Sequence, residues 1–133
     1  MGIAEDFIST ARGIINSLKN KFNIADQIEH RNLLILCTDA VELALKALLL
    51  KRFKWTKDDT KRKIRHRLAK VFEYIPAPTH IMSQVDKFDN KNWSWERRYP
   101  ELCYAAETTS IFPEDPVPVA EEILRWAEIE FDK

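Results

Sequence analysis

Apolar residues recur along most of this chain at intervals of three and four, the period of an α-helix with one buried face. The first such stripe consists of Ile3, Phe7, Ala11, Ile14, Ile15 and Leu18. Later stripes predict a helix that Thr60 caps and Pro76 ends, a short helix after Thr79 and a helix opened by Pro100. A last helix begins near Val117 or Pro118, with a buried stripe of Ala120, Ile123, Leu124, Ala127 and Phe131. No segment alternates like a β-strand, so the pattern predicts an all-α fold, an up-and-down bundle of about five helices.

The second helix, over residues 25–53, differs from the others because its middle is apolar on nearly every side. A helix of this kind is a buried helix. Glu42 and Lys46 lie four positions apart and therefore share one face of it. Charged groups are rarely buried unless they are paired. The two residues are therefore expected to pair with each other, or to line a site or an interface. The apolar surplus around Leu45 to Leu50 also predicts a surface for dimerisation.

Charge is distributed unevenly along the chain. Its 133 residues predict one domain over residues 1–133, and its formal net charge is zero. Between positions 51 and 70 the chain is basic, with Lys51, Arg52, Lys54, Lys57, Lys61, Arg62, Lys63, Arg65, Arg67 and Lys70 opposed only by Asp58 and Asp59. From Glu101 onward it is acidic. Two interpretations stay open. The basic segment could bind a polyanion partner, or the two segments could be solvated faces or neutralise one another within a dimer.

Several classes of site are disfavoured by the residue types present. Cys37 and Cys103 lack C-x-x-C spacing and are expected to pack as small apolar side chains in a reducing, cytoplasmic setting. The three histidines, His30, His66 and His80, lack metal-ligand spacing, and the two glycines cannot form a phosphate-binding loop. We therefore expect no metal and no cofactor. No signal sequence is evident, and the most apolar run contains charges, so no membrane span is expected.

One group of residues could carry chemistry. It combines Glu42 and Lys46 with His66 and with the run Arg97-Arg98-Tyr99. Arginine binds phosphate in bidentate fashion and aromatic rings stack on bases, so this group is typical of a nucleotide or nucleic-acid site. The structural alternative is that Glu42 and Lys46 form an ordinary intrahelical pair, that His66 lies on the surface and that Tyr99 packs by its ring.

Three motifs give the chain a resemblance to the HEPN domain family. The run from Asp39 to Leu49, Asp-Ala-Val-Glu-Leu-Ala-Leu-Lys-Ala-Leu-Leu, resembles the signature of that family's second helix. His66-Arg67-Leu68 resembles its H-x-L pattern, and Arg98-Tyr99-Pro100 matches its R-Y-P tripeptide. The resemblance implies a helical bundle, usually a homodimer, that binds a nucleotide or nucleic acid. By this resemblance the expected binding positions are Glu42, Lys46, His66, Arg98 and Tyr99.

The resemblance also suggests a partner and an alternative activity. Many HEPN proteins work beside a small nucleotidyltransferase, and others are RNases, including toxins of toxin–antitoxin pairs. The RNase members carry arginine and histidine separated by four to six residues, a pair that this chain lacks. The predicted function is therefore a non-catalytic, nucleotide- or nucleic-acid-binding homodimer that acts with a nucleotidyltransferase-type protein. Two alternatives remain: an RNase that uses His66 as base and Arg97 or Arg98 to hold phosphate, and a purely structural adaptor.

Overall fold

The structure, a computed structural model, describes residues 2–19, 27–64, 67–89 and 114–133, with the side chains at 27 and 28 outside the description. All regular structure within these residues is helical. The helices are α1 (Ile3–Leu18), α2 (Gln27–Phe53), α3 (Lys57–Ile64), the 3₁₀ helix η1 (Leu68–Glu73), α4 (Thr79–Phe88) and α6 (Pro116–Asp132). The all-α helical bundle predicted from the sequence is confirmed. The predicted helix at Pro100 lies outside the described residues.

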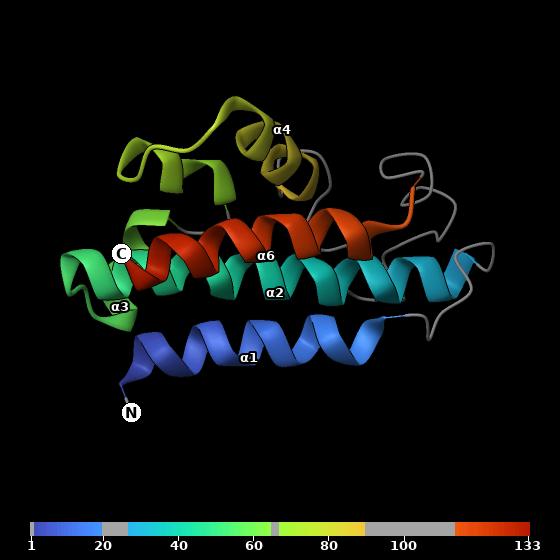
Figure 1. Ribbon diagram of the computed structural model, residues 1–133, viewed down its shortest axis with the longest axis horizontal. Helices are drawn as coiled ribbons and strands as arrows, with labels where there is room; N and C mark the ends of the chain where they lie inside the picture. Colours follow the sequence, from blue (N-terminus) through green and yellow to red (C-terminus); the bar gives the residue numbers. More distant parts are fainter. Residues whose placement is uncertain (1, 20–26, 65–66, 90–113) are drawn as a thin grey trace.

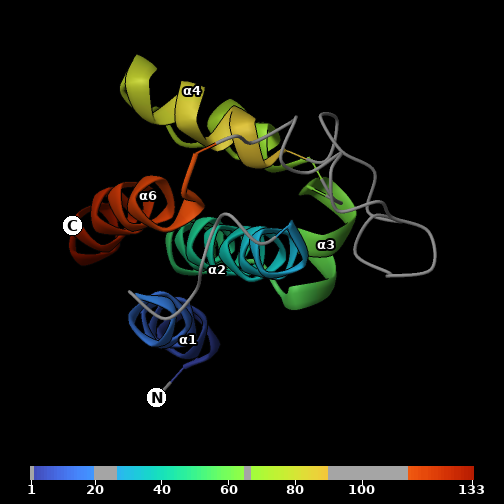
Figure 2. The same ribbon diagram turned by 90° about the vertical axis from the view of Figure 1, so that its right-hand side faces the viewer.

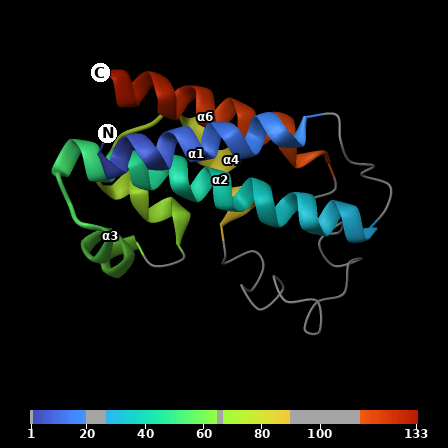
Figure 3. The same cartoon turned by 90° about the horizontal axis from the view of Figure 1, so that it is seen from below.

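Helix α2 is the centre of the bundle. Figure 1 shows α1 and α6 lying along it, and Figure 2, turned to look along α2, shows α1, α6, α4 and α3 arranged around it. Figure 3 shows that α3 lies at the end of the bundle where α2 finishes and α1 begins. An apolar helix with neighbours on several sides can bury most of its circumference, as the sequence pattern requires.

Contacts at both ends of α2 fix the direction of α6. Near the start of α2, the His30 Nε2 atom lies 3.3 Å from the Glu114 carbonyl oxygen, just before α6 begins. At the other end, Arg52 lies 3.4 Å from the Glu130 carboxylate near the end of α6. Helix α6 therefore runs parallel to α2, whereas α1 runs antiparallel to both (Figure 1). The up-and-down arrangement predicted from the sequence therefore holds for α1 and α2, which are antiparallel, but not for α2 and α6, which are parallel.

The apolar middle of α2 is covered by the chain's own helices. Leu45 and Leu49 are 0% exposed, and Leu50 is 4% exposed. The expectation of an apolar surplus at Leu45 to Leu50 for dimerisation is therefore wrong, because α1, α6 and the other neighbours already bury these leucines. Homodimerisation itself stays a prediction that needs another surface.

The predicted helix from Thr60 to Ile75 is wrong, because the segment forms two shorter elements. Helix α3 begins earlier, at Lys57, because Thr56 and Asp59 form a reciprocal capping box: the Asp59 N–H donates to the Thr56 hydroxyl at 3.0 Å, and the Thr56 N–H donates to the Asp59 carboxylate at 3.1 Å. After Ile64 the chain resumes as η1. There the buried Asp89 accepts a hydrogen bond from the Ala69 N–H at 3.1 Å. This long-range cap competes with helix continuation.

The other helix boundaries agree with the sequence to within a residue or two. Helix α6 begins at Pro116, because Asp115 caps it by accepting a hydrogen bond from the Val117 N–H and because proline suits a first helical turn. Its predicted stripe is buried, as the sequence indicated. Helix α4 begins at Thr79, but Thr79 is its first residue and its side chain is not the cap.

An ion-pair network joins α1 to α6. The Arg12 guanidinium donates to the Glu128 carboxylate, with an Nε–Oε2 distance of 3.0 Å, and also contacts Glu121. Lys19 contacts the other oxygen of Glu121 at 2.8 Å. Burial opposes ionisation of Glu121, but the hydrogen bonds and charges of Lys19 and Arg12 outweigh it and hold the pKa of Glu121 below its ordinary value of 4.5. Much of the acidity of α6 is thus neutralised within the chain by α1.

This network makes a pH-dependent contribution to stability. Because the pKa of Glu121 is lower in the folded chain, its contribution is complete above about pH 4.5 and is lost as the pH falls through the folded pKa. We expect Glu121→Gln to lower the free energy of unfolding at pH 7 by about 1–2 kcal/mol and to flatten its decline below pH 4.5. Urea unfolding over a pH series measures both effects. Glu122→Gln is the matched control, because this side chain on the same helix is 48% exposed; an equal effect there would contradict the assignment.

Candidate polyanion-binding surface

The predicted site residues fall into two groups. Glu42 and Lys46 lie on α2 within the described residues. His66, Arg98 and Tyr99 lie outside them, so whether the five come together stays a prediction. No metal site is assembled by the part of the chain that the structure describes: no group of three or more histidine, cysteine, aspartate or glutamate side chains there could hold an ion. Among the described helices, none is both long and apolar enough to cross a membrane.

Glu42 and Lys46 pair with each other, as the sequence suggested. The Lys46 Nζ atom lies 3.2 Å from the Glu42 Oε2 atom, and the two side chains are 17% and 19% exposed. The second oxygen of the Glu42 carboxylate, Oε1, is buried and has no hydrogen-bond partner among the described residues. A carboxylate with one oxygen unsatisfied carries a desolvation cost that a single lysine only partly offsets. Glu42 and Lys46 thus form an intrahelical ion pair in which the Glu42 Oε1 atom accepts no hydrogen bond from the described residues.

The other groups that could react on α2 are buried. Cys37 is 0% exposed, and burial, aided by the negative charge of Asp115, raises the pKa of its thiol to about 12. Such a thiol is not ionised near neutral pH and is a poor nucleophile. His30 is 1% exposed and its Nε2 atom contacts the Glu114 carbonyl oxygen. His30 therefore joins the start of α2 to the residue before α6, and the buried Cys37 is unreactive, as expected from the sequence.

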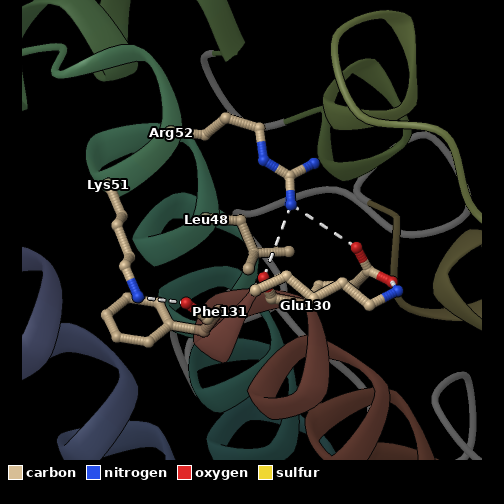
Figure 4. A pocket seen from close by; sticks show the side chains of 6 residues that line it. Leu48, Lys51, Arg52, Glu130 and Phe131 are labelled. Carbon is tan, nitrogen blue, oxygen red and sulfur yellow. Dashed lines mark hydrogen bonds and ion pairs between the residues drawn. The ribbon is translucent and has the colours of Figure 1, made fainter.

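A small pocket lies where α2 and α6 end together (Figure 4). It encloses about 200 Å³ between Leu48, Lys51, Arg52, Glu130, Phe131 and Lys133. Its cations are already occupied: Lys51 donates to the Phe131 carbonyl oxygen, and Arg52 contacts the carbonyl oxygen and carboxylate of Glu130. Cationic side chains commonly satisfy the last carbonyls of a helix in this way. Lys51 and Arg52 thus cap the end of α6, and these contacts leave them less available to bind a ligand in the pocket.

Most lysines of the basic segment, positions 51 to 70, are not engaged in this way. Five of its described lysines form no ion pair with any described residue: Lys54, Lys57, Lys61, Lys63 and Lys70. Two of them also lie over aromatic rings, Lys57 over Phe7 and Lys63 over Trp55. Lys54, Lys57, Lys61 and Lys63 are exposed. Arg62, in contrast, pairs with Asp59 at 2.9 Å. The basic segment thus leaves cations without an ion pair, whereas Glu121, Glu128 and Glu130 of α6 are paired with Arg12, Lys19 and Arg52.

An aromatic cluster lies within this basic surface and was not predicted from the sequence. Phe53 at the end of α2 and Trp55 stack with ring centroids 5.4 Å apart, and Tyr74 meets the edge of Trp55 at 4.9 Å. Phe53 and Tyr74 are 40% and 39% exposed. Sequence analysis missed the cluster because Tyr74 lies some twenty positions from the other two. The only signal was the density of aromatic residues among the lysines.

The structural role of the Glu42–Lys46 pair can be separated from a binding role. We expect Lys46→Met to lower the free energy of unfolding by about 1–3 kcal/mol, because it leaves a largely buried carboxylate without its cation. The double variant Glu42→Gln/Lys46→Met should recover most of that loss, since no charge remains unpaired. Chemical unfolding of the two single variants and the double variant measures the coupling. Additive losses would contradict a structural pair.

Comparisons of the chain with protein-family models, with curated proteins and with solved structures find no match. The charges, burial and ring geometry described above are therefore what bears on its function.

Proposed function

We propose that this chain is a HEPN-type protein that binds a nucleic acid or nucleotide, without cleaving it, through its basic surface. The observation that carries the proposal is the group of lysines from Lys54 to Lys70 that form no ion pair within the described chain. Phosphate groups are the anions such a surface attracts, and each lysine that neutralises a phosphate releases a counterion. A net charge of zero is compatible with this proposal, because several carboxylates, Glu121 and Glu130 among them, are paired with cations outside this group of lysines.

Neutralisation of α6 by the basic segment within one chain is less well supported. If the basic segment served to balance α6, its lysines would contact the carboxylates of that helix. Instead Glu121 and Glu128 pair with Arg12 of α1 and with Lys19 directly after it, and among the described residues of the basic segment Arg52 alone reaches Glu130. The other described lysines of the segment form no ion pair with these carboxylates, and within the segment only Asp58 and Asp59 oppose them. A surface of this kind favours an external polyanion.

The rest of the proposal comes from the resemblance of the sequence to HEPN domains. We propose a homodimer that acts with a nucleotidyltransferase-type partner, and we place Glu42, Lys46, His66, Arg98 and Tyr99 among its binding positions. The half-buried Glu42 with an unsatisfied oxygen fits a role at a contact. Catalysis is not part of the proposal, because the sequence lacks the arginine and histidine spacing that the RNases of that family use.

Removing charge from the basic surface should weaken binding. We expect the triple variant Lys54→Gln/Lys57→Gln/Lys61→Gln to bind a fluorescent single-stranded oligonucleotide about 10- to 100-fold more weakly than the unmodified chain at low salt, because three phosphate contacts are lost. Fluorescence anisotropy measures the dissociation constants. These side chains are exposed and unpaired, so the thermal unfolding midpoint should change little.

The matched control removes the same net charge from elsewhere. Lys19→Gln/Lys87→Gln/Arg125→Gln changes three cations that lie on α1, α4 and α6 and pair with glutamates. We expect it to bind within about threefold of the unmodified chain, because local charge and not net charge governs phosphate contacts. Equal weakening by both triple variants, or no binding of any oligonucleotide or nucleotide, would contradict the proposal.

A further inference from the structure

We propose that the aromatic cluster of Phe53, Trp55 and Tyr74 is a stacking platform for the bases of a single-stranded nucleic acid. This inference rests on the proposed function and names both the ligand class and the surface that recognises it. The surrounding lysines would contact the phosphates, while the exposed rings of Phe53 and Tyr74 would receive unpaired bases. This combination of a cationic surface with accessible aromatic faces is the general basis of single-strand binding.

The first support is that the three rings pack against one another while Phe53 and Tyr74 stay exposed. Trp55 is the half-buried centre: Phe53 stacks on it at an interplanar angle of 28°, and Tyr74 meets it edge-on at 84°. Phe53 and Tyr74 themselves lie 6.2 Å apart. The outer two rings remain 40% and 39% exposed. Rigid rings held in place by a third ring lose little conformational entropy when a base stacks on them.

The second support is backbone strain at the residue that builds the cluster. Lys54, between Phe53 and Trp55, has a φ of 57°, in the left-handed region that L-residues adopt at a cost of about 1–2 kcal/mol. Glycine is the usual residue directly after a helix in this conformation. Here a lysine occupies the position, and the turn brings Trp55 back onto Phe53. Strain of this kind concentrates at functional sites, and the same turn places a cation beside the rings.

The third support is charge complementarity around the rings. The Lys63 Nζ atom lies 5.3 Å from the Trp55 ring centroid, and Lys54 separates Phe53 from Trp55 in the chain. The carboxylates nearest in sequence are Asp58, Asp59 and Glu73. Asp59 is engaged by Thr56 and Arg62. Lys63 over the Trp55 face and Lys54 between the two rings place cations at the cluster itself, which favours an anionic ligand with flat apolar faces over an apolar protein surface.

The same geometry favours single strands over duplexes. Bases in a duplex are stacked on each other and cannot stack on Phe53 or Tyr74, so a duplex would contact only the lysines. A single strand uses both features. The expected order of affinity at equal salt is therefore single strand first, with duplex and linear polyphosphate weaker.

The test compares ring-deleting and ring-preserving substitutions on the full chain. Phe53→Leu and Tyr74→Leu keep apolar volume but remove the stacking face, whereas Tyr74→Phe keeps the ring. Binding of a single-stranded oligonucleotide of about 12 nucleotides and of linear polyphosphate is measured by anisotropy or competition, with thermal unfolding as the check of folding. We expect each leucine variant to lose roughly 5- to 100-fold in oligonucleotide affinity with unchanged polyphosphate affinity, and Tyr74→Phe to bind like the unmodified chain.

Distinct outcomes separate the two proposals. Salt-sensitive binding that the leucine variants leave unchanged would overturn the stacking platform while leaving a polyanion-binding function intact. Loss of self-association in the leucine variants, measured by sedimentation, with unchanged oligonucleotide binding would identify the cluster as a protein interface and would also overturn it. No binding of oligonucleotide or polyphosphate by the unmodified chain would overturn both proposals. If a leucine variant unfolds, Tyr74→Phe is compared with Tyr74→Met, which keeps apolar volume without a ring. Loss of oligonucleotide affinity in Tyr74→Met alone supports stacking, and equal affinity of these two variants contradicts it.

Discussion

The arrangement of this protein follows from the need to cover α2 on nearly every side. An isolated helix with the sequence of Leu43 to Leu50 would expose leucine all round, and burial of each such side chain contributes about 1.5–3 kcal/mol. The solution is a central helix with α1 antiparallel and α6 parallel to it, closed on the remaining sides by α3, η1 and α4 (Figures 1 and 2). Because α6 is parallel to α2, their carboxyl ends meet, and Lys51 and Arg52 are placed to cap the last carbonyls of α6. The parallel packing of α6 on α2 thus directs Lys51 and Arg52 to the carboxyl end of α6.

The same packing separates the charges. Helix α6 places Glu121 and Glu128 against α1, where Arg12 and Lys19 neutralise them, so these two carboxylates do not compete for the lysines that follow α2. Lys54, Lys57, Lys61 and Lys63 lie on α3 and the connection before it, at one end of the bundle (Figure 3), and Lys70 lies on η1. A chain with no net charge therefore presents a local cationic surface, and exposed aromatic rings are embedded in it. Binding of a polyanion is a consequence of where the charges are paired and does not follow from their total.

The sequence predicted the parts of this structure that depend on local pattern. The stripes of α1, α4 and α6, the buried character of α2 and the Glu42–Lys46 pair all follow from helical period, which a single chain reveals directly. It failed where a distant residue decided the outcome. Asp89 caps η1 from outside the segment and breaks the predicted helix after Thr60, and Tyr74 joins Phe53 and Trp55 only through the fold. The apolar residues from Leu45 to Leu50 were wrongly predicted to form a dimer surface for the same reason, because the helices that bury them, α1 and α6, come from the two ends of the chain. His66, Arg98 and Tyr99 lie outside the described residues, so that part of the candidate site stays a prediction.

The central claim is that unpaired lysines at one end of the bundle bind phosphate. The most direct test is the dissociation constant of the unmodified chain for a single-stranded oligonucleotide, measured over a series of salt concentrations. The account predicts a straight line of log affinity against log salt with a negative slope of about 0.7 for each phosphate contacted. Three or more contacts would give a slope steeper than about −2. Affinity that is independent of salt, or an absence of binding at low salt, would contradict it.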